Sequence, residues 1–276
     1  MYGVDLDPQA AELAAVNLML RAMTRDVRLP LILNQNIKVG NSLLGGLPVR
    51  GAEALHALAP FAEQLRELRR LRLAQQGIAQ DKRHPLELQG QFERLAHELN
   101  MALNKGLSRY FNGEVMEKRP FNWIIEFPEI FLNEQGQLRP DGGFTFILGN
   151  PPYLSVDDTW GNNSPDAAYL KQAFADIWAG KSDAYYYFIR RGLSLLEPDG
   201  QLGFITARYY LEAYYAQNLR QVILQEANLR QIIDFGDYTV FPRVGTKTCI
   251  TLLQRQEDDQ SRAANSFLCD KVAHNK

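Results

Sequence analysis

The chain has 276 residues, of which 46% are hydrophobic and 22% charged, so it can bury a sizeable core and has the composition of an ordinary globular protein. Its formal net charge of −2 excludes a globally basic nucleic-acid-binding protein, so a nucleic acid would have to be held by a local patch or by a further module. Two cysteines, Cys249 and Cys269, exclude a disulfide framework and a Cys-rich zinc site, and no apolar run approaches the roughly 18 residues of a membrane-spanning helix. We therefore predict no metal site and expect a reduced, cytoplasmic setting without a signal peptide.

The chain begins with the pattern of a short strand, residues 1–7, followed by a helix from Ala10 to Met23. Pro8 suits a helix start, and Asp7 is a plausible N-cap. An acid at such a strand end, here Asp5, can accept both hydroxyls of a ribose, but Asp5 and Asp7 can equally serve only to cap the helix.

Residues 36–43 form a second predicted strand with a polar turn, where Asn41 or Ser42 could meet the edge of a purine. Residues 52 to about 110 then carry leucines and phenylalanines at intervals of three and four, which predicts a helical hairpin. Its arginines, Arg66, Arg69, Arg70 and Arg72, could contact phosphate, although a solvated face is the favoured interpretation because glutamates and glutamines alternate with them.

The segment from Phe121 to Phe131 is aromatic-rich and is interpreted as an extended, packed cover on a sheet. Phe144 to Leu148 has the β-branched and aromatic residues of a buried strand. Asn150-Pro-Pro-Tyr153 follows it, and two prolines in succession make the loop stiff. Open α/β sheets bind their ligands at the carboxyl ends of strands, so this loop is the candidate site.

Strands and helices alternate over the remainder. Ser182 is the predicted cap of a helix over 183–196, and four tyrosines that follow the strand 201–207 favour half-buried packing over stacking on bases. The other expected elements are a loop at 155–165, a helix at 167–178, a helix at 218–227, a strand at 229–235, a turn at 236–241, an edge or antiparallel strand at 246–254, and a loose polar tail from 257. This alternation predicts an α/β fold with a doubly wound, mostly parallel Rossmann-like sheet.

The loop offers an amide, fixed carbonyls and an aromatic ring, which suits a planar substrate that carries an amine. Asn150 Oδ1 and the carbonyl of Pro151 or Gly149 could accept both hydrogens of an NH₂ group and so localise the nitrogen lone pair. Tyr153 would stack on the plane of the substrate. No strong base is needed if the electrophile is as potent as a sulfonium methyl group, because alignment then supplies much of the rate.

Asn150-Pro-Pro-Tyr153 resembles the catalytic motif of S-adenosylmethionine-dependent adenine-N6 DNA methyltransferases, and Phe127-Pro-Glu-Ile-Phe131 is especially like the fused type IIG restriction–modification and phage-defence methylases. The resemblance covers residues 1 to about 255. Further segments that look like family motifs are Tyr2 to Pro8 (cofactor ribose), Lys38 to Leu43 (cofactor adenine), Ser182 to Phe188, Leu195 to Thr206, and Val240 to Cys249 (flipped base).

This resemblance implies a role for each matching residue. Asp5 would bind the cofactor ribose, Leu6 would pack on its adenine, and Asn41 with Ser42 would meet the adenine edge. Asn150 and Pro151 would accept from the target N6 amine, with Pro152 completing the motif. Tyr153 would stack on the flipped base, and Phe241 would lie against that base edge-on.

The resemblance also departs from the family pattern. The family's Gly-rich first motif and its central strand precede the ribose motif, whereas here Met1 directly precedes Tyr2. We expect a truncated piece of a larger methylase that cannot methylate alone, with a target-recognition domain supplied elsewhere. The expected division is a partial catalytic domain at 1–50 and 120–256, a helical insertion at 51–119 and a tail at 257–276.

Other interpretations remain open at this stage. The same motif can methylate RNA or a protein glutamine amide, and the chain can be a non-catalytic fragment or one half of a split enzyme. A nicotinamide-binding Rossmann protein is disfavoured, because no GxGxxG lies about twenty residues before Asp5.

Overall fold

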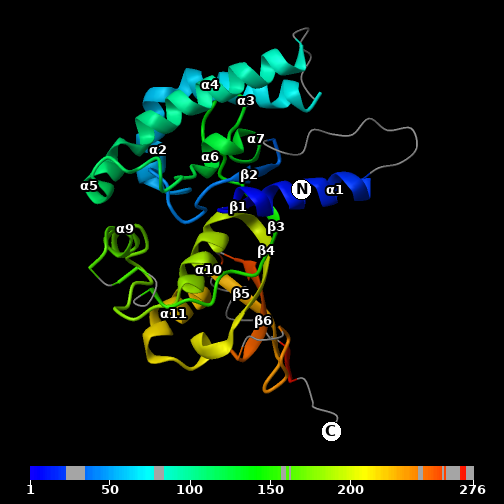
Figure 1. The fold of residues 1–276 in the computed structure, drawn as a ribbon, viewed down its shortest axis with the longest axis vertical. Coiled ribbons are helices and arrows are strands. Elements are labelled where there is room, and N and C mark those ends of the chain that lie inside the picture. Colours follow the sequence, from blue (N-terminus) through cyan, green and yellow to red (C-terminus); the bar gives the residue numbers. More distant parts are fainter. Residues whose placement is uncertain are drawn as a thin grey trace. The chain divides into compact units, whose positions relative to one another are not determined.

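A computed structural model describes residues 1–22, 35–77, 84–156, 160–161, 163–241, 245–256, 258 and 268–271. The chain divides into two compact units, residues 1–137 and 138–276, which are described separately below (Figure 1). None of the described helices is both long and apolar enough to cross a membrane.

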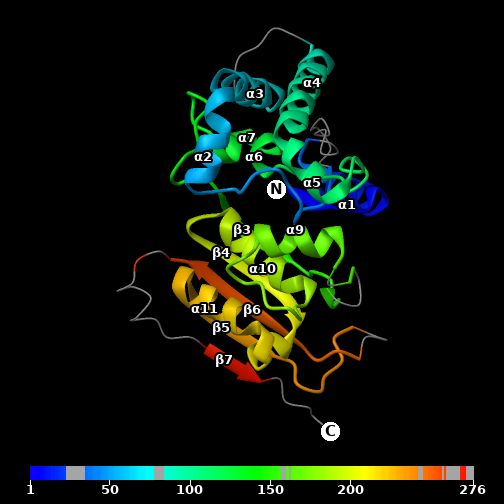
Figure 2. The same cartoon turned by 90° about the vertical axis from the view of Figure 1, so that its left-hand side faces the viewer.

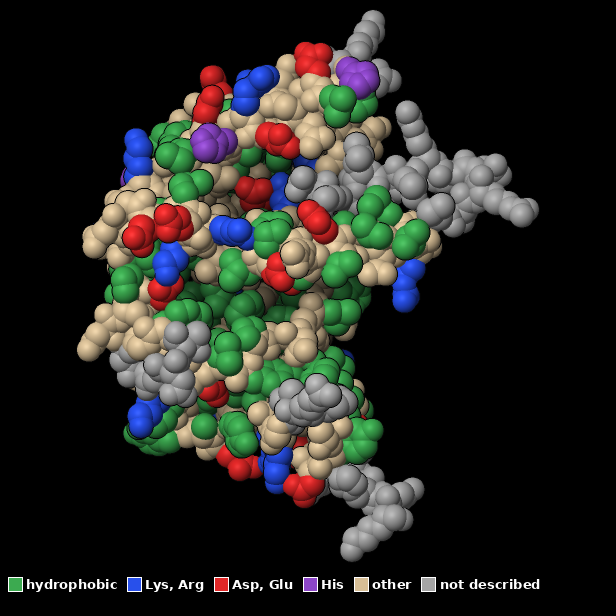
Figure 3. Space-filling view, in the orientation of Figure 1, with side chains coloured by type: hydrophobic (Ala, Val, Ile, Leu, Met, Phe, Trp, Pro, Cys, Tyr) green, Lys and Arg blue, Asp and Glu red, His purple; other side chains and the backbone are tan. Residues whose placement is uncertain are grey.

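The first unit begins with two short parallel strands joined through a helix. Strand β1 (Gly3–Asp5) pairs with β2 (Ile37–Val39), and helix α1 (Pro8–Ala22) runs between them in sequence. The predicted N-cap is confirmed, because Asp7 Oδ1 accepts the Gln9 N–H at 2.9 Å. Ala11 and Ala15 of α1 pack on Ile37. Larger apolar side chains of α1 are exposed, namely Leu13, Val16 and Leu20. Hydrophobic side chains, drawn in green, are visible on the surface of this part of the chain in Figure 3.

The predicted helical hairpin is confirmed. Helices α3 (Ala62–Gln75) and α4 (Pro85–Leu103) pack on each other, and the leucines and phenylalanine at intervals of three and four form their buried faces. The interpretation of its arginines as a solvated face is wrong for Arg72, which is fully buried. The hairpin is flanked by α2 (Ala52–Leu58), α5 (Ser108–Phe111) and 3₁₀ turns at 59–61 and 104–107.

The aromatic segment 121–131 is helical rather than extended. It forms two single-turn helices, α6 (Trp123–Glu126) and α7 (Pro128–Phe131). Pro128 occupies the first position of α7, where its missing N–H costs nothing. The packed character of the segment is confirmed, since Ile125 and Phe127 are fully buried.

The second unit contains a five-stranded sheet in the order β3-β4-β6-β5-β7 (Figure 2). The pairs β3–β4 and β5–β7 are parallel, and β6 is antiparallel to both neighbours. Four of the five strands thus share one direction, which confirms the mixed α/β class with a mostly parallel sheet. The strands are β3 (Phe144–Gly149), β4 (Leu196–Ala207), β5 (Ala227–Asp234), β6 (Thr248–Arg255) and β7 (Leu268–Lys271).

Helices α10 (Ala184–Leu195) and α11 (Gln217–Glu226) cover one face of this sheet. They contact each other while α10 packs on β4 and α11 on β5. Alternate sheet residues point into this layer, among them Leu202, Phe204 and Leu253. The unit also contains α9 (Pro165–Ala173) and 3₁₀ turns at 208–211 and 214–216.

Four details of the second unit differ from the sequence predictions. Strand β3 is not buried on both faces, because Phe146 is 66% and Leu148 83% exposed. Ser182 does not cap α10 with its side chain, since its hydroxyl donates to the carbonyl of Ala179. Strand β6 is antiparallel as one alternative had it, yet it lies inside the sheet. The tail predicted as loose contains β7, while its other residues except 258 lie outside the described part.

Candidate active site

The Asn-Pro-Pro-Tyr loop leaves the carboxyl end of β3, as the sequence predicts. Gly149, the last residue of the strand, pairs with Phe204, and a Cβ at this position would come within 2.8 Å of the Phe204 ring. Asn150 and Pro152 are exposed, Pro151 is buried and Tyr153 is half-buried. Downstream, the Ala184 N–H donates to the carbonyl of Leu154 at 2.7 Å, which ties the loop to the start of α10. The loop therefore presents Asn150 on a support that is fixed at both ends.

The Tyr153 hydroxyl is hydrogen-bonded to Asn150. It donates to Asn150 Oδ1 at 2.7 Å and lies 3.3 Å from the carbonyl oxygen of Ile205. A hydroxyl has one proton, so the longer contact is the weaker one. An amide oxygen has two lone pairs, and Asn150 Oδ1 thus keeps capacity for a second donor.

Burial raises the pKa of Tyr153 to about 12, with a smaller contribution from the thiol of Cys249. The hydroxyl is therefore a neutral donor at pH 7. Two further tyrosines, neither of them among the predicted site residues, pack behind this ring. Tyr185 lies edge-on to it at 6.4 Å between ring centroids, and Tyr210 lies 6.3 Å beyond Tyr185. The Tyr210 hydroxyl reaches Thr251 Oγ1 at 2.6 Å. The three-tyrosine run at 185–187 was the available signal, but a run alone does not say which ring faces the loop.

The other aromatic residues near this loop differ in how far they are exposed. Tyr210 is buried, as the packing interpretation of the tyrosine cluster requires, whereas Tyr214 is 80% exposed. Phe241 lies half-buried in the segment after β5, and among the described residues its ring makes no contact with the ring of Tyr153. Further exposed rings follow β4 and β5: Tyr209, Tyr215 and Tyr238.

The four predicted cofactor residues gather in the first unit, at the carboxyl ends of β1 and β2. The Gly40 N–H donates to the Asp5 carbonyl at 2.8 Å, so the two strand ends lie side by side. Asp5 is exposed; its Oδ1 accepts the Asp7 N–H at 2.8 Å, and its Oδ2 has no hydrogen-bond partner within the described residues. Leu6 is 55% exposed. In the turn after β2, Asn41 Oδ1 accepts the Leu43 N–H at 3.2 Å and the Ser42 carbonyl accepts the indole N–H of Trp123 at 3.1 Å.

These residues fit the ribose and adenine part of an adenosyl cofactor. A carboxylate oxygen without a protein partner suits a vicinal diol, and an exposed leucine beside it suits the face of a purine. The amide nitrogen of Asn41 and the Ser42 hydroxyl also have no partner within the described residues and can meet polar atoms at the purine edge. The capping contacts of the two acids are compatible with cofactor binding. Asp7 caps α1, and Asp5 uses only one of its carboxylate oxygens to accept the Asp7 N–H.

Comparison of the sequence with known proteins finds a matching family. The model of the family described as Eco57I restriction-modification methylase matches residues 1–241. The type II restriction enzyme and methyltransferase RM.Eco57I of Escherichia coli is 27% identical over 116 residues, which are 42% of this chain and 12% of the relative. The type II methyltransferase M.PaeR7I of Pseudomonas aeruginosa is 29% identical over 133 residues, 48% of this chain and 22% of the relative. The EcoKI M protein of a type I restriction enzyme superposes with a TM-score of 0.29 at 16% identity, over 41% of this chain and 21% of that one.

Proposed function

Since the chain belongs to the Eco57I restriction-modification methylase family, we propose that it is the catalytic segment of a DNA methyltransferase that methylates N6 of adenine. The methyl donor is S-adenosylmethionine and the target base is flipped out of the duplex. The observation that carries the proposal is the Asn150 amide, held at the carboxyl end of β3 with acceptor capacity left on Oδ1.

In this proposal the loop residues activate the N6 amine of the target base. Asn150 Oδ1 and the Pro151 carbonyl accept the two N6 hydrogens, which localises the nitrogen lone pair otherwise delocalised into the ring. Tyr153 stacks on the base, a contact worth ~1–3 kcal/mol, and Phe241 lies against its edge. N6 would form the new bond to the methyl carbon while the carbon–sulfur bond of the donor breaks and its electron pair stays on sulfur, which leaves a neutral thioether, and the methylated nitrogen would then release one proton to solvent. Base flipping follows from the chemistry, because N6 is engaged in pairing inside a duplex.

The first unit binds the cofactor in this proposal. Asp5 accepts from the ribose hydroxyls, Leu6 packs on the adenine, and Asn41 with Ser42 recognises its edge. When bound, S-adenosylmethionine supplies a methyl group on a sulfonium, an electrophile strong enough to make a strong general base unnecessary.

Other parts of a larger enzyme complete the machinery. The chain spans 12% and 22% of the lengths of RM.Eco57I and M.PaeR7I, two of the curated relatives it matches. Phe146 and Leu148 lie two residues apart on β3 and are both largely exposed, which suits a face of the strand that another element covers. We propose that a further strand of the enzyme packs against β3, that a Gly-rich loop holds the methionine part of the cofactor, and that a separate target-recognition domain reads the DNA sequence. The purified 276-residue chain is then expected not to bind S-adenosylmethionine with micromolar affinity, and such binding would contradict the proposed dependence on further parts.

The proposal is tested with an intact methylase that contains this segment. Labelled methyl transfer is measured to DNA, RNA and glutamine-containing protein, and digested DNA is analysed for N6-methyladenine. Asn150→Ala should lower kcat by roughly 10²–10³-fold, the usual effect of removing one preorganised polar group from a reacting centre. Asn163→Ala is the matched control, since Asn163 is exposed in the loop that follows and lies outside the motif.

Each outcome decides between the open interpretations. Label on DNA adenine, lost with Asn150→Ala and kept with Asn163→Ala, supports the proposal. Label on RNA or on glutamine would show that the enzyme performs the same chemistry on a substrate other than DNA. An intact enzyme that labels none of the three would support a non-catalytic module instead.

A further inference from the structure

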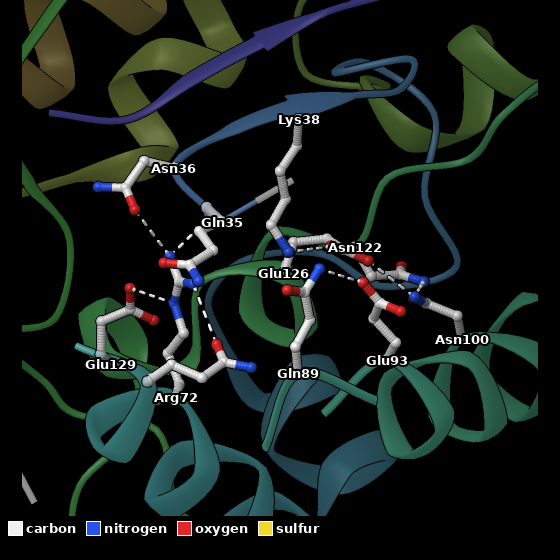
Figure 4. Close-up of polar contacts among 11 residues, drawn as sticks. Gln35, Asn36, Lys38, Arg72, Gln89, Glu93, Asn100, Asn122, Glu126 and Glu129 are labelled. Carbon is white, nitrogen blue, oxygen red and sulfur yellow. Dashed lines mark hydrogen bonds and ion pairs between the residues drawn. The ribbon is translucent and has the colours of Figure 1, made fainter. Parts of the chain in front are cut away.

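Two acidic residues, one in α6 and one in α7, form ion pairs with two basic side chains in the interior of the first unit. Glu126 pairs with Lys38 of β2, and Glu129 pairs with Arg72 of α3 (Figure 4). The Lys38 and Arg72 side chains are 8% and 1% exposed, and the carboxylates are 19% and 5% exposed. None of these four residues belongs to the proposed site, so their burial calls for a separate explanation.

The Lys38–Glu126 pair connects β2 to the hairpin. Lys38 Nζ lies 2.6 Å from Glu126 Oε2, and it lies over the rings of Phe92 and Phe127 at 5.1 and 5.5 Å from their centroids. The other carboxylate oxygen, Oε1, accepts from the Asn100 amide of α4 at 2.9 Å. Glu126 thus joins a strand residue to a helix that is distant in sequence.

The network continues from Asn100 to the turn after β2. Asn122 donates to Asn100 Oδ1 at 2.8 Å and to Asn104 Oδ1 at 2.9 Å. The Gly46 N–H in turn points at Asn122 Oδ1 and Asn104 Oδ1, at 2.9 and 3.1 Å. The same chain of polar groups therefore runs from the Glu126 carboxylate to the backbone of Gly46. We call residues 40–46 the adenine turn, because they contain Asn41 and Ser42.

The adenine turn is enclosed by the segment that carries Glu126. The Asn41 N–H donates to the Arg119 carbonyl at 2.8 Å, and the Phe121 N–H donates to the Leu44 carbonyl at 2.7 Å. At Gly46 there is no room for a side chain, since a Cβ would come within 2.2 Å of the Leu103 carbonyl oxygen. The turn is thus held between residues 119–123 and the end of α4. Lys38 lies in β2, the strand that leads directly into the turn.

Buried charge pairs are weak devices for stability, because their desolvation offsets most of their attraction. In some proteins such buried polar groups instead fix the register of the elements that they join. We propose that Glu126 is a positioning residue: by holding Lys38 and Asn100 it sets the adenine turn in the conformation that recognises the cofactor. This rests on the proposed function for the identity of the ligand, and on the contacts above for the conformation.

The first test uses the 276-residue chain and amide hydrogen exchange. Glu126→Gln removes the charge at nearly constant shape, so exchange of the amides of Gly40, Asn41, Leu44 and Gly46 should rise at least 10-fold more than exchange of the buried α3 amides at 65–71. Glu93→Gln is the matched control, because Glu93 of α4 is exposed and its one hydrogen bond within the described residues is accepted by Oε1 from Gln89, at 2.9 Å. Unchanged exchange in the adenine turn, or an equal rise in both segments, overturns the proposal, since the latter would show general destabilisation.

A second variant separates positioning from stability. In Lys38→Met/Glu126→Leu the pair is replaced by apolar groups of similar size, which is expected to preserve the thermal midpoint. The adenine turn should nevertheless exchange faster than in the wild-type chain. If this double variant keeps both its stability and the protection of the turn, Glu126 has no positioning role. Should Glu126→Gln fail to fold, the double variant decides alone.

The final arm measures the cofactor in an intact methylase that carries the segment. Both variants should raise KM for S-adenosylmethionine about 10-fold and leave kcat within twofold, because the reacting loop is untouched. A wild-type enzyme that does not use S-adenosylmethionine would refute the proposed function, while the exchange data would still decide whether Glu126 positions the turn. A wild-type enzyme that uses it, with KM unchanged in both variants, overturns the inference alone.

Discussion

The buried Arg72–Glu129 pair allows the sharpest prediction about stability. Arg72 is fully buried, with Nε 3.0 Å from Glu129 Oε1 and with further bonds to the Gln35 carbonyl and to Asn36 Oδ1. Glu129 Oε1 also accepts from Gln76 at 2.9 Å. The variants are Arg72→Met, Glu129→Leu and their combination. Each single change leaves an opposite charge in the interior without its partner.

The expected magnitudes follow from that burial. Breaking a buried pair by removing one partner costs about 3–5 kcal/mol, whereas replacing both partners by apolar groups is often neutral. For a protein of this size each kcal/mol shifts the melting temperature by about 2–4 °C, so each single variant should melt roughly 6–20 °C lower. The double variant should lose clearly less than the sum of the two, with a coupling energy above ~2 kcal/mol. Arg72 also bonds the Gln35 carbonyl, so Arg72→Met should be the more damaging single change.

The assay is urea unfolding followed by the fluorescence of Trp123, the one tryptophan of residues 1–137. Trp160→Phe and Trp178→Phe in the background remove the signal of the second unit. Additive single losses, or single variants within about 0.5 kcal/mol of the parent, would show that the pair is solvated and would refute the reasoning.

Two further predictions concern a close contact and an ionisation. Gly46→Ala should cost about 1–3 kcal/mol, because its Cβ would meet the Leu103 carbonyl at 2.2 Å, whereas Gly90→Ala in α4 meets no atom within 4 Å and should stabilise by up to about 1 kcal/mol; equal urea midpoints would contradict the enclosed turn. The pKa of Tyr153 is raised to about 12, so the folded state keeps a proton that the unfolded state releases near pH 10; its contribution to stability is present below pH 10 and is lost as the pH rises through 12. At pH 11 the native chain and Tyr153→Phe should therefore have nearly the same absorbance at 295 nm, whereas an ordinary tyrosine would be about nine-tenths ionised.

Sequence periodicity predicted the elements that depend on local pattern. The hairpin helices follow from leucines at intervals of three and four, and β3 with its loop follows from an apolar run that ends at Gly149 and two prolines. Asp7 as N-cap is likewise a local property. In each of these cases the deciding interaction lies within a few residues of the pattern.

The features that the sequence did not reveal depend on distant partners. Arg72 looks like one member of a charged row, and only the carboxylate of Glu129, 57 residues away, makes its burial possible. Phe146 and Leu148 have the composition of a buried strand, but burial depends on whether another element covers that face of β3. The hydroxyl bond from Tyr153 to Asn150 spans only three residues, yet a motif does not encode rotamers.

The loop after β3 and the adenine turn are therefore stabilised by different interactions. Substitutions in the two places should accordingly affect different kinetic parameters. Asn150 is exposed and Tyr153 half-buried, so truncating Asn150 removes the proposed acceptor of the amine while it disturbs little of the core. The residues behind the adenine turn behave in the opposite way. Glu126 and Asn122 contact no proposed ligand, and yet they fix the backbone that carries Asn41. A loss confined to kcat thus points to the loop after β3, and a loss confined to cofactor KM points to the buried polar network of the first unit. A variant of Asn150 that raised only the cofactor KM would contradict this division, because the hydrogen bond of the Asn150 side chain stays within its own loop, to Tyr153.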